Sequence, residues 1–226
     1  MEILYEDNHI IAINKTNSDI VQVDKTGDLS LEEKIKSYIK EKYNKPGDVF
    51  LGVVHRIDRP VSGAVVFART SKALTRLNDM FKNKDVQKTY WAIVKEKPKK
   101  ELATLNHYIV RDQQKNKSFA FDNEVKNSKL ASLSYKLVAK GENYYLLEID
   151  LHTGRHHQIR CQLAKIGCPI KGDLKYGFPR SNPDGGISLH SRKIEFIHPV
   201  KKEKVIIIAK TPKDALWDYF SSIVKD

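Results

Sequence analysis

The chain has 226 residues, 40% of them hydrophobic, and a formal net charge of +12. The hydrophobic share excludes a wholly disordered chain, and the apolar runs are far shorter than the roughly 20 residues that cross a bilayer. The 40 Lys and Arg residues against 28 Asp and Glu favour a polyanionic partner, with nucleic acid first. The N-terminus shows no signal peptide, and Cys161 and Cys168 cannot form a disulfide framework, so a reducing cytoplasm is expected.

The first part of the chain predicts short strands and two helices. Strands are expected at 3–5, 10–14, 51–57, 63–68 and 87–95. Ser30-Leu-Glu-Glu33 has the pattern of a capping box, which predicts a helix that ends at Pro46. A second helix is expected after Ser71, whose side chain can cap its first turn.

The second part of the chain predicts hairpins and two further helices. Residues 111–129 are polar and favour either a surface hairpin or a mobile insert that faces RNA. Residues 132–139 and 144–151 are expected to form the two strands of a hairpin, and a helix is expected over 156–166. Late strands at 188–197 and 204–210 precede a last helix, which Thr211 caps and Pro212 begins.

These elements predict the fold class. About ten strands and four helices occur without regular strand–helix alternation, which favours an α+β fold over a doubly wound parallel sheet. We expect a mixed, mostly antiparallel central β-sheet with a few flanking helices. The sequence contains no internal repeat and no convincing linker, so a single domain over 1–226 is expected.

A metal site is the weaker interpretation of the histidines. Four potential zinc ligands lie close together in the sequence: His152, His156, His157 and Cys161. Arg155 and Arg160 stand among them, and their charges would repel a divalent cation. We therefore expect no metal. Dinucleotide or nucleoside triphosphate binding by the usual loops is not expected either, since the chain lacks a P-loop and a GxGxxG motif. A metal-dependent hydrolase remains an alternative function.

Two clusters of candidate residues lie at the exit of one predicted strand and within another. In HRIDRPVSG (55–63), Asp58 is flanked by arginines, and a nearby positive charge favours an ionised carboxylate. The alternative is a surface turn that holds an Arg–Asp ion pair. In KTYWAIV (88–94), Tyr90 shares a strand face with Ala92 and lies opposite Trp91. Tyr90 is therefore either a core residue or the wall of a pocket.

A third cluster covers LHTGRHHQIR (151–160) and GCPIKGDLKYG (167–177). A helix that begins after Gly154 would offer its N-terminus to a phosphate, and Arg155 and His156 would add positive charge there. Arg160 would lie one turn further along the same polar side. The alternative is a solvated helix face.

The three clusters, in this order, resemble the RluA family of pseudouridine synthases. The family's His-Arg-Leu-Asp-x-x-Thr-Ser-Gly hallmark corresponds to HRIDRPVSG, with Val61 where Thr is common. KTYWAIV, TGRHHQIR, GCPIKGDLKYG and LHSRKIEFIHP are similar to four further family segments. The sequence departs from the family after Lys15, where Pro-x-Gly is usual, and after Arg160, where Cys161 and Gln162 follow.

The resemblance implies an activity. It indicates an RNA pseudouridine synthase that flips a uridine of ribosomal or transfer RNA out of its stack, cleaves the glycosidic bond and rejoins uracil through carbon 5. No redox change occurs, so no cofactor is implied. By resemblance, Asp58 is the catalytic carboxylate, Arg160 its ion-pair partner, and Tyr90 the aromatic residue that stacks on uracil.

The resemblance also implies which residues meet RNA: His55, Arg56, Arg59, Arg155, His156 and Ile159. Arg56 is similar to the residue that fills the gap left by the flipped base, and Ile159 is expected to pack against uracil. The partner is expected to be a structured RNA, a ribosomal or transfer RNA stem-loop, and neither DNA nor a membrane. A cytoplasmic monomer is expected. A protein that binds RNA without turnover is the first alternative.

Overall fold

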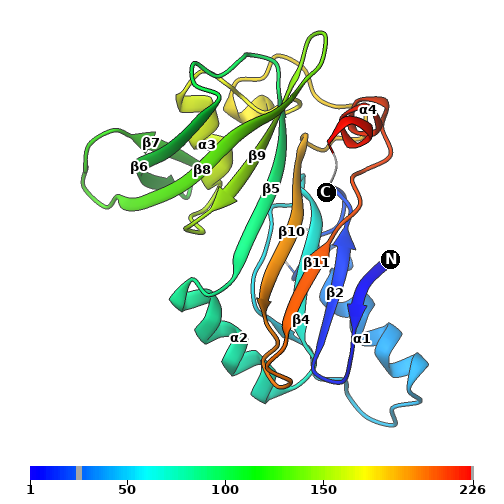
Figure 1. Cartoon of the computed structure of the whole chain (residues 1–226). Helices are drawn as coiled ribbons and strands as arrows, with labels where there is room; N and C mark the ends of the chain where they lie inside the picture. The colour runs from blue at the N-terminus through cyan, green and yellow to red at the C-terminus, as the bar shows by residue number, and fades with distance from the viewer. Residues whose placement is uncertain (24–26, 225–226) are drawn as a thin grey trace. The chain divides into compact units, whose positions relative to one another are not determined.

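The computed structural model describes residues 1–23 and 27–224, which fall into two compact units (Figure 1). Unit 1 comprises Met1–Val86 and Ser191–Lys210, and unit 2 comprises Gln87–His190 and Thr211–Asp226. Each unit has its own strands, helices and hydrophobic core. The expected single domain over 1–226 stays a prediction.

Unit 1 is built on a β-sheet in which several strand pairs are antiparallel. The strands are β1 (Glu2–Glu6), β2 (Ile10–Lys15), β3 (Gly52–Val53), β4 (Ser62–Ala68), β10 (Leu189–Ile197, from Ser191 onward) and β11 (Lys204–Ile208). Their order is β1-β2-β4-β10, with β3 paired to β4 and β11 paired to β10. Helices α1 (Leu31–Lys42) and α2 (Ser71–Asn83) complete the unit.

The helix starts in unit 1 test two capping predictions. The capping box at Ser30 is confirmed, because Ser30 Oγ accepts from the Glu33 backbone N–H and Glu33 Oε2 accepts from the Ser30 N–H. The cap at Ser71 is wrong by one residue. Thr70 has the extended backbone of an N-cap and accepts from the Ala73 N–H, so Ser71 is the first helical residue.

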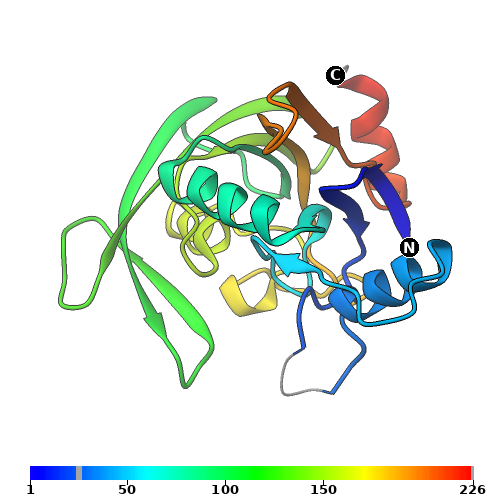
Figure 2. The ribbon, with the colours of Figure 1, turned by 90° about the horizontal axis from the view of Figure 1, so that it is seen from below.

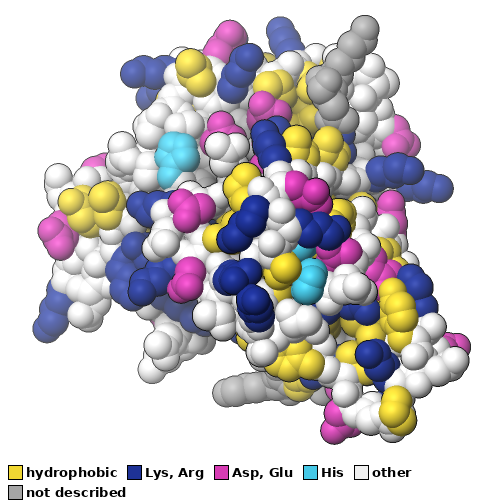
Figure 3. Space-filling view, turned by 60° about the horizontal axis from the view of Figure 1, so that its bottom comes forward, with side chains coloured by type: hydrophobic (Ala, Val, Ile, Leu, Met, Phe, Trp, Pro, Cys, Tyr) yellow, Lys and Arg dark blue, Asp and Glu magenta, His cyan; other side chains and the backbone are white. Residues whose placement is uncertain are grey.

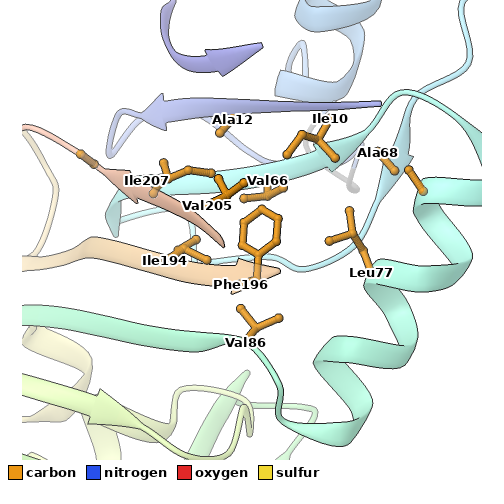
Figure 4. Close-up of a cluster of buried hydrophobic side chains, with 13 residues drawn as sticks. Ile10, Ala12, Val66, Ala68, Leu77, Val86, Ile194, Phe196, Val205 and Ile207 are labelled. Atoms are coloured by element: carbon orange, nitrogen blue, oxygen red, sulfur yellow. The ribbon is translucent and has the colours of Figure 1, made fainter. Parts of the chain in front are cut away.

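The core of unit 1 lies where α2 packs on the strands (Figure 4). Leu77 of α2 and Val86 lie around Phe196 of β10, together with Ile10 and Val66. Every residue of β4 is buried, as the apolar run in its sequence predicts. Burial of apolar surface contributes about 25 cal/mol per Å² to folding, so this cluster anchors β4, the strand that follows the Asp58 loop.

The strand predicted at 51–57 is shorter than expected. Only Gly52–Val53 pair with β4, at Ala68 and Phe67. Further along, the side chain of His55 meets β4 instead, with His55 Nε2 accepting from the Val66 N–H at 3.0 Å. The chain therefore leaves the sheet before Asp58 and reaches it as a loop.

Unit 2 is a five-stranded antiparallel sheet with two α-helices. Its strands are β5 (Gln87–Val94), β6 (Leu102–Asp112), β7 (Lys117–Phe121), β8 (Lys129–Lys140) and β9 (Tyr145–Leu151), in the order β5-β9-β8-β6-β7. Helix α3 (Gln158–Lys165), the 3-10 turn η1 (Leu174–Tyr176) and α4 (Ala215–Ile223) follow. The fold is of the expected α+β class with antiparallel pairing.

The polar segment 111–129 forms a hairpin, which confirms one of its two interpretations. Tyr108–Asp112 of β6 pair with Lys117–Phe121 of β7, and the green loops that flank β7 project at the left of Figure 2. Most of β6 has no counterpart among the predicted strands. Polar residues interrupt its apolar pattern, and they find polar cross-strand partners, as where Thr104 bonds to Ser134 at 2.8 Å.

Both helix starts in unit 2 differ from the prediction. Helix α3 begins at Gln158, after His157 in a left-handed conformation at φ 52°. Arg155 and His156 therefore precede the helix instead of forming its N-terminus. Helix α4 is capped by Asp214, whose Oδ1 accepts from the Leu216 and Trp217 N–H groups, and not by Thr211.

Membrane insertion by a helix finds no support in the described residues. None of the helices there combines the length and the apolar content that a bilayer crossing requires.

Candidate active site

The Asp58 loop of unit 1 is fixed by backbone contacts. Asp58 is half-buried, and its carbonyl accepts from the Val61 N–H at 3.0 Å, which closes a tight turn. Gly63 follows at φ +114°, where a Cβ atom would lie 2.4 Å from the Ser191 carbonyl oxygen. Since no larger residue fits there, Gly63 lets β4 approach β10 directly behind the loop.

Lys15, at the end of β2, supports the same loop from inside. Its side chain is only 1% exposed, and its Nζ donates to the carbonyls of Thr16, Arg59 and Val61 at 2.7 to 2.8 Å. Three acceptors match the three hydrogens of an ammonium group. The ammonium of Lys15 therefore holds the turn that carries Asp58. No role for Lys15 follows from the sequence motifs.

Burial lowers the pKa of Lys15 to about 7, although the nearby carboxylates of Asp19 and Asp58 act in the opposite direction. The pKa of an unburied lysine is 10.5. Between these two values the unfolded chain binds the proton and the folded chain does not. The contribution of Lys15 to stability therefore rises as pH increases from about 7 toward 10.5.

This shift predicts a pH-dependent effect of Lys15→Met. The variant is expected to be less stable by about 1 to 3 kcal/mol at pH 9, because the buried carbonyls of the turn lose the Lys15 amine as their donor. Its deficit is expected to shrink toward pH 6, where the wild type must bury a full charge. Urea unfolding from pH 6 to 9 measures both values. Lys40→Met, at an exposed lysine of α1, is the control; equal pH slopes for wild type and Lys15→Met would contradict the lowered pKa.

The three predicted RNA-binding residues of unit 1 differ in their surroundings. Arg56 and Arg59 are exposed, and Arg59 pairs with Asp28 at 2.7 Å. A cavity of about 420 Å³ lies beside Arg56, and its walls include Val54. His55 has a structural role as well, since its ring stacks on Phe81 at 4.8 Å while Nε2 accepts from β4.

Tyr90 of unit 2 lies in the middle of β5 and is 6% exposed. Its cross-strand neighbour is Ile149 of β9. Trp91 points to the other side of the sheet, where it packs with Trp217 and Phe220. The predicted alternation along β5 is confirmed, and it separates Tyr90 from the core that α4 covers.

Arg160 is held in a buried ion pair. Its Nε and Nη2 donate to the two carboxylate oxygens of Asp173 at 2.7 and 2.9 Å, and the side chains are 6% and 1% exposed. The ring of Tyr176 lies 5.1 Å from the Arg160 guanidinium carbon. Bidentate pairing fixes the plane of a guanidinium group, so Asp173 orients Arg160. The alternative interpretation of this cluster, a solvated helix face, is wrong, because Gln158–Leu163 are all buried.

Tyr176 extends this arrangement to the β6–β7 hairpin. Its hydroxyl accepts from the Ser118 N–H at 2.8 Å and bonds to His157 Nδ1 at 2.9 Å. His156 stacks on His157 with ring centres 3.8 Å apart, and its Nδ1 bonds to the Ser118 hydroxyl. Asp173 and Tyr176 are thus two residues to which the sequence assigned no role, although both stand in the quoted GDLKYG segment.

The candidate zinc ligands are engaged in hydrogen bonds. His152 Nδ1 bonds to Ser132, and the Cys161 thiol donates to the Gln158 carbonyl. Within residues 1–23 and 27–224, no group of three or more His, Cys, Asp or Glu side chains is placed to hold a metal ion. The local geometry around α3 is that of a hydrogen-bond network.

The remaining predicted residues of unit 2 lie on either side of this network. Arg155 is exposed, and its Nε donates to the Leu130 carbonyl at 3.1 Å. Ile159 is buried, at 4% exposure. Within unit 2 the structure therefore brings Arg155, His156 and Arg160 into one segment beside the hairpin, whereas Asp58, Arg56 and Arg59 share one loop of unit 1.

Comparison with solved structures identifies the class of fold. The human RNA Pseudouridylate Synthase Domain Containing 4 structure matches with a TM-score of 0.80 over 97% of this chain and 92% of that chain, at 22% identity. At this identity the likeness shows the fold alone, and that fold is the pseudouridine synthase fold.

Sequence comparison identifies the family. Residues 9–165 match the RNA pseudouridylate synthase family, and the chain belongs to it. The Bacillus subtilis protein called Uncharacterized RNA pseudouridine synthase YhcT is 32% identical over 95% of this chain and 70% of its own length. Ribosomal large subunit pseudouridine synthase C of Rickettsia typhi is 34% identical over 93% of this chain and 68% of its own length. The resemblance to RluA-type enzymes is confirmed: the protein is an RNA pseudouridine synthase, an isomerase that acts on RNA.

Proposed function

We propose that the enzyme isomerises a uridine of ribosomal RNA, with Asp58 as the catalytic carboxylate. The observation that carries this proposal is the Asp58 loop, which Lys15 and Gly63 hold in one conformation just before the buried strand β4. The name of the Rickettsia relative, which refers to the large ribosomal subunit, supports ribosomal RNA. Transfer RNA is the second substrate to test.

The proposed reaction conserves atoms and electrons. Asp58 acts on the ribose, either by attacking the sugar or by removing a ribose proton, while the bond between the sugar and nitrogen 1 breaks. The uracil rotates and carbon 5 bonds to the sugar. In the same step the Asp58–sugar bond breaks, or, in the second route, the ribose regains its proton from Asp58. Carbon 5 then loses its proton, and nitrogen 1 gains one. No electrons are exchanged with another molecule.

Tyr90 and Arg160 have supporting roles in this proposal. The Tyr90 ring stacks on the flipped uracil, and its hydroxyl takes part in the removal of the carbon 5 proton. Ile159 packs against the base. Asp173 orients Arg160. By resemblance to the family, we assign to Arg160 the pairing with the catalytic carboxylate.

Exposed cations supply the affinity for RNA. Arg56, Arg59 and Arg155 are exposed within the motifs that resemble the family, and we assign them to phosphates. We also assign Arg56 to the gap left by the flipped base. Lys and Arg side chains are spread over the face shown in Figure 3, with Asp and Glu between them. We infer that the enzyme works as a cytoplasmic monomer, a location that suits the buried free thiols of Cys161 and Cys168.

Phosphate contacts predict a steep salt dependence. The Arg59→Gln variant is expected to lower the slope of log K against log salt by about 0.7 to 0.9, the value for one lost phosphate contact. Filter binding to transcribed ribosomal RNA between 50 and 200 mM salt, about the range in which such effects are large, measures this slope. Lys40→Gln, on an exposed face of α1, serves as the control of equal charge change. A flat salt response of the wild type would contradict the assignment.

The proposed function is tested directly with purified protein. Transcribed ribosomal and transfer RNAs, which lack pseudouridine, are incubated with the enzyme and then mapped for pseudouridine. We expect product at one or a few uridines of ribosomal RNA, with unchanged yield in the presence of a chelator. Binding without product would favour the RNA-binding alternative, and loss of all activity in chelator would favour a metal-dependent reaction.

A further inference from the structure

Unit 2 contains a cavity of about 540 Å³ that none of the RNA-binding residues predicted above lines. Its cationic lining residues are Lys95, Lys171 and Arg180, and its aromatic ones are Tyr144 and Phe178. All of its lining residues are in the described part of the chain, and none is acidic. Its volume lies in the range of about 300 to 1,000 Å³ that is typical of small-ligand sites.

The walls of this cavity are held by specific contacts. Lys171 Nζ donates to Asn182 Oδ1 at 2.6 Å, and Asn182 Nδ2 donates to the Ser188 hydroxyl at 3.2 Å. Gly172 has φ +86°, and a Cβ atom there would lie 2.7 Å from Asn182. The Lys171 N–H also donates to the Ile93 carbonyl of β5. The loop that carries Phe178 and Arg180 is therefore fastened to the segment that carries Lys171.

The combination of cations and rings indicates the chemistry of a ligand. Lys95 and Arg180 are exposed at the cavity and suit the oxygens of a phosphate. Tyr144 is half-buried and offers a ring on which a base can stack, a contact worth about 1 to 3 kcal/mol per base. The cavity is lined by three cationic side chains and no carboxylate, which disfavours a cationic ligand. Phosphate and base together describe a nucleotide.

We infer that this cavity binds a nucleotide of the RNA substrate other than the target uridine. The inference rests on the proposed function, which places the target base at Tyr90. Lys95 lies five residues along the chain from Tyr90, just past the end of β5, and a strand rises about 3.4 Å per residue, which gives about 17 Å. This distance is larger than the spacing of neighbouring stacked nucleotides, so the cavity would hold a nucleotide other than the target uridine.

Ultraviolet crosslinking tests the inference without requiring turnover. The full-length enzyme is irradiated with transcribed ribosomal RNA and with transfer RNA, and the crosslinked peptides are identified by mass spectrometry. We expect nucleotides on the peptides that contain Tyr144 or Phe178. The absence of such crosslinks, with others found around the Asp58 loop, would overturn the inference while leaving the proposed function intact.

A pair of charge-matched variants supplies the second measurement. Lys95→Gln/Arg180→Gln is expected to weaken RNA binding at least fivefold at 100 mM salt and to lower the salt slope by about 0.7 to 0.9 per lost phosphate contact. Lys99→Gln/Lys100→Gln, on exposed lysines of the following loop outside the cavity lining, removes the same charge and is expected to bind as the wild type. Equal affinities for the two double variants would overturn the inference.

Small probes separate RNA from a free ligand. Uridine 5′-monophosphate and inorganic phosphate are titrated against the wild type and against Lys95→Gln/Arg180→Gln. Weak binding of both probes, in the millimolar range, is expected for a site that holds one unit of a longer RNA. Micromolar binding of uridine 5′-monophosphate that the double variant loses, without crosslinks to RNA, would assign the cavity to a free nucleotide and overturn the inference.

Discussion

Asp58→Asn is expected to lower kcat by at least about 10⁴-fold, because the amide can neither attack the sugar nor accept a ribose proton. The fold is expected to persist. Lys15 Nζ holds the turn by donating to the backbone carbonyls of Arg59 and Val61, and neither bond uses the Asp58 side chain. Affinity for RNA is expected to stay within a few-fold, since phosphate contacts supply most of it. Single-turnover assays and filter binding measure the two quantities.

The control for this variant is Asp79→Asn, which makes the same substitution on an exposed position of α2. It is expected to be fully active. If Asp58→Asn kept more than about a tenth of the wild-type rate, Asp58 would be neither nucleophile nor base. If Asp58→Asn also lost its cooperative unfolding transition, the loss of activity would be a folding effect.

Asp173→Ala is expected to have the largest effect on stability, with a loss of about 3 to 5 kcal/mol. The substitution leaves the Arg160 guanidinium buried without its bidentate acceptor, in a site where the side chain is 6% exposed. It also frees the plane of the guanidinium, which we expect to lower kcat by more than a hundredfold at temperatures where the variant remains folded. Urea unfolding and single-turnover kinetics measure the two effects.

A double variant separates the structural role of this ion pair from its role in catalysis. Arg160→Met/Asp173→Leu replaces both buried charges with apolar side chains, a change that is often neutral for stability. We expect it to recover most of the stability that Asp173→Ala loses but none of the activity. A stable and active double variant would show that Arg160 has no part in the reaction and that Asp173 positions nothing.

Local sequence signals predicted the fold where one short segment decides the outcome. The capping box at Ser30 involves residues three positions apart, and it forms as predicted. Where two capping residues compete within a few positions, the pattern could not choose. Thr70 stands beside Ser71. Asp214 stands three residues after Thr211 and nearer to Trp217 and Phe220, which pack against Trp91 of β5. For α4, packing contributes to where the helix begins, which cap propensity alone does not show.

The site was predictable through its motifs but not through its contacts. The resemblance named Asp58, Tyr90 and Arg160 from residue patterns, and their roles stay predictions. It did not indicate Lys15, whose acceptor on Arg59 is 44 residues away, or Asp173, which pairs with Arg160 across 13 residues. Such pairings depend on how strands and loops meet in space. The local sign in the sequence was a lysine at the end of the apolar strand IIAINK, because an ammonium that is buried there needs carbonyl partners.

The central claim is that this enzyme forms pseudouridine in RNA through Asp58, and one measurement in cells tests it most directly. Pseudouridine is mapped in total RNA from cells with the gene, without it, and with the gene restored as wild type or as Asp58→Asn. We predict that one or a few pseudouridines, in ribosomal RNA, disappear without the gene and return with the wild type alone. Restoration of the same sites by Asp58→Asn would contradict the account.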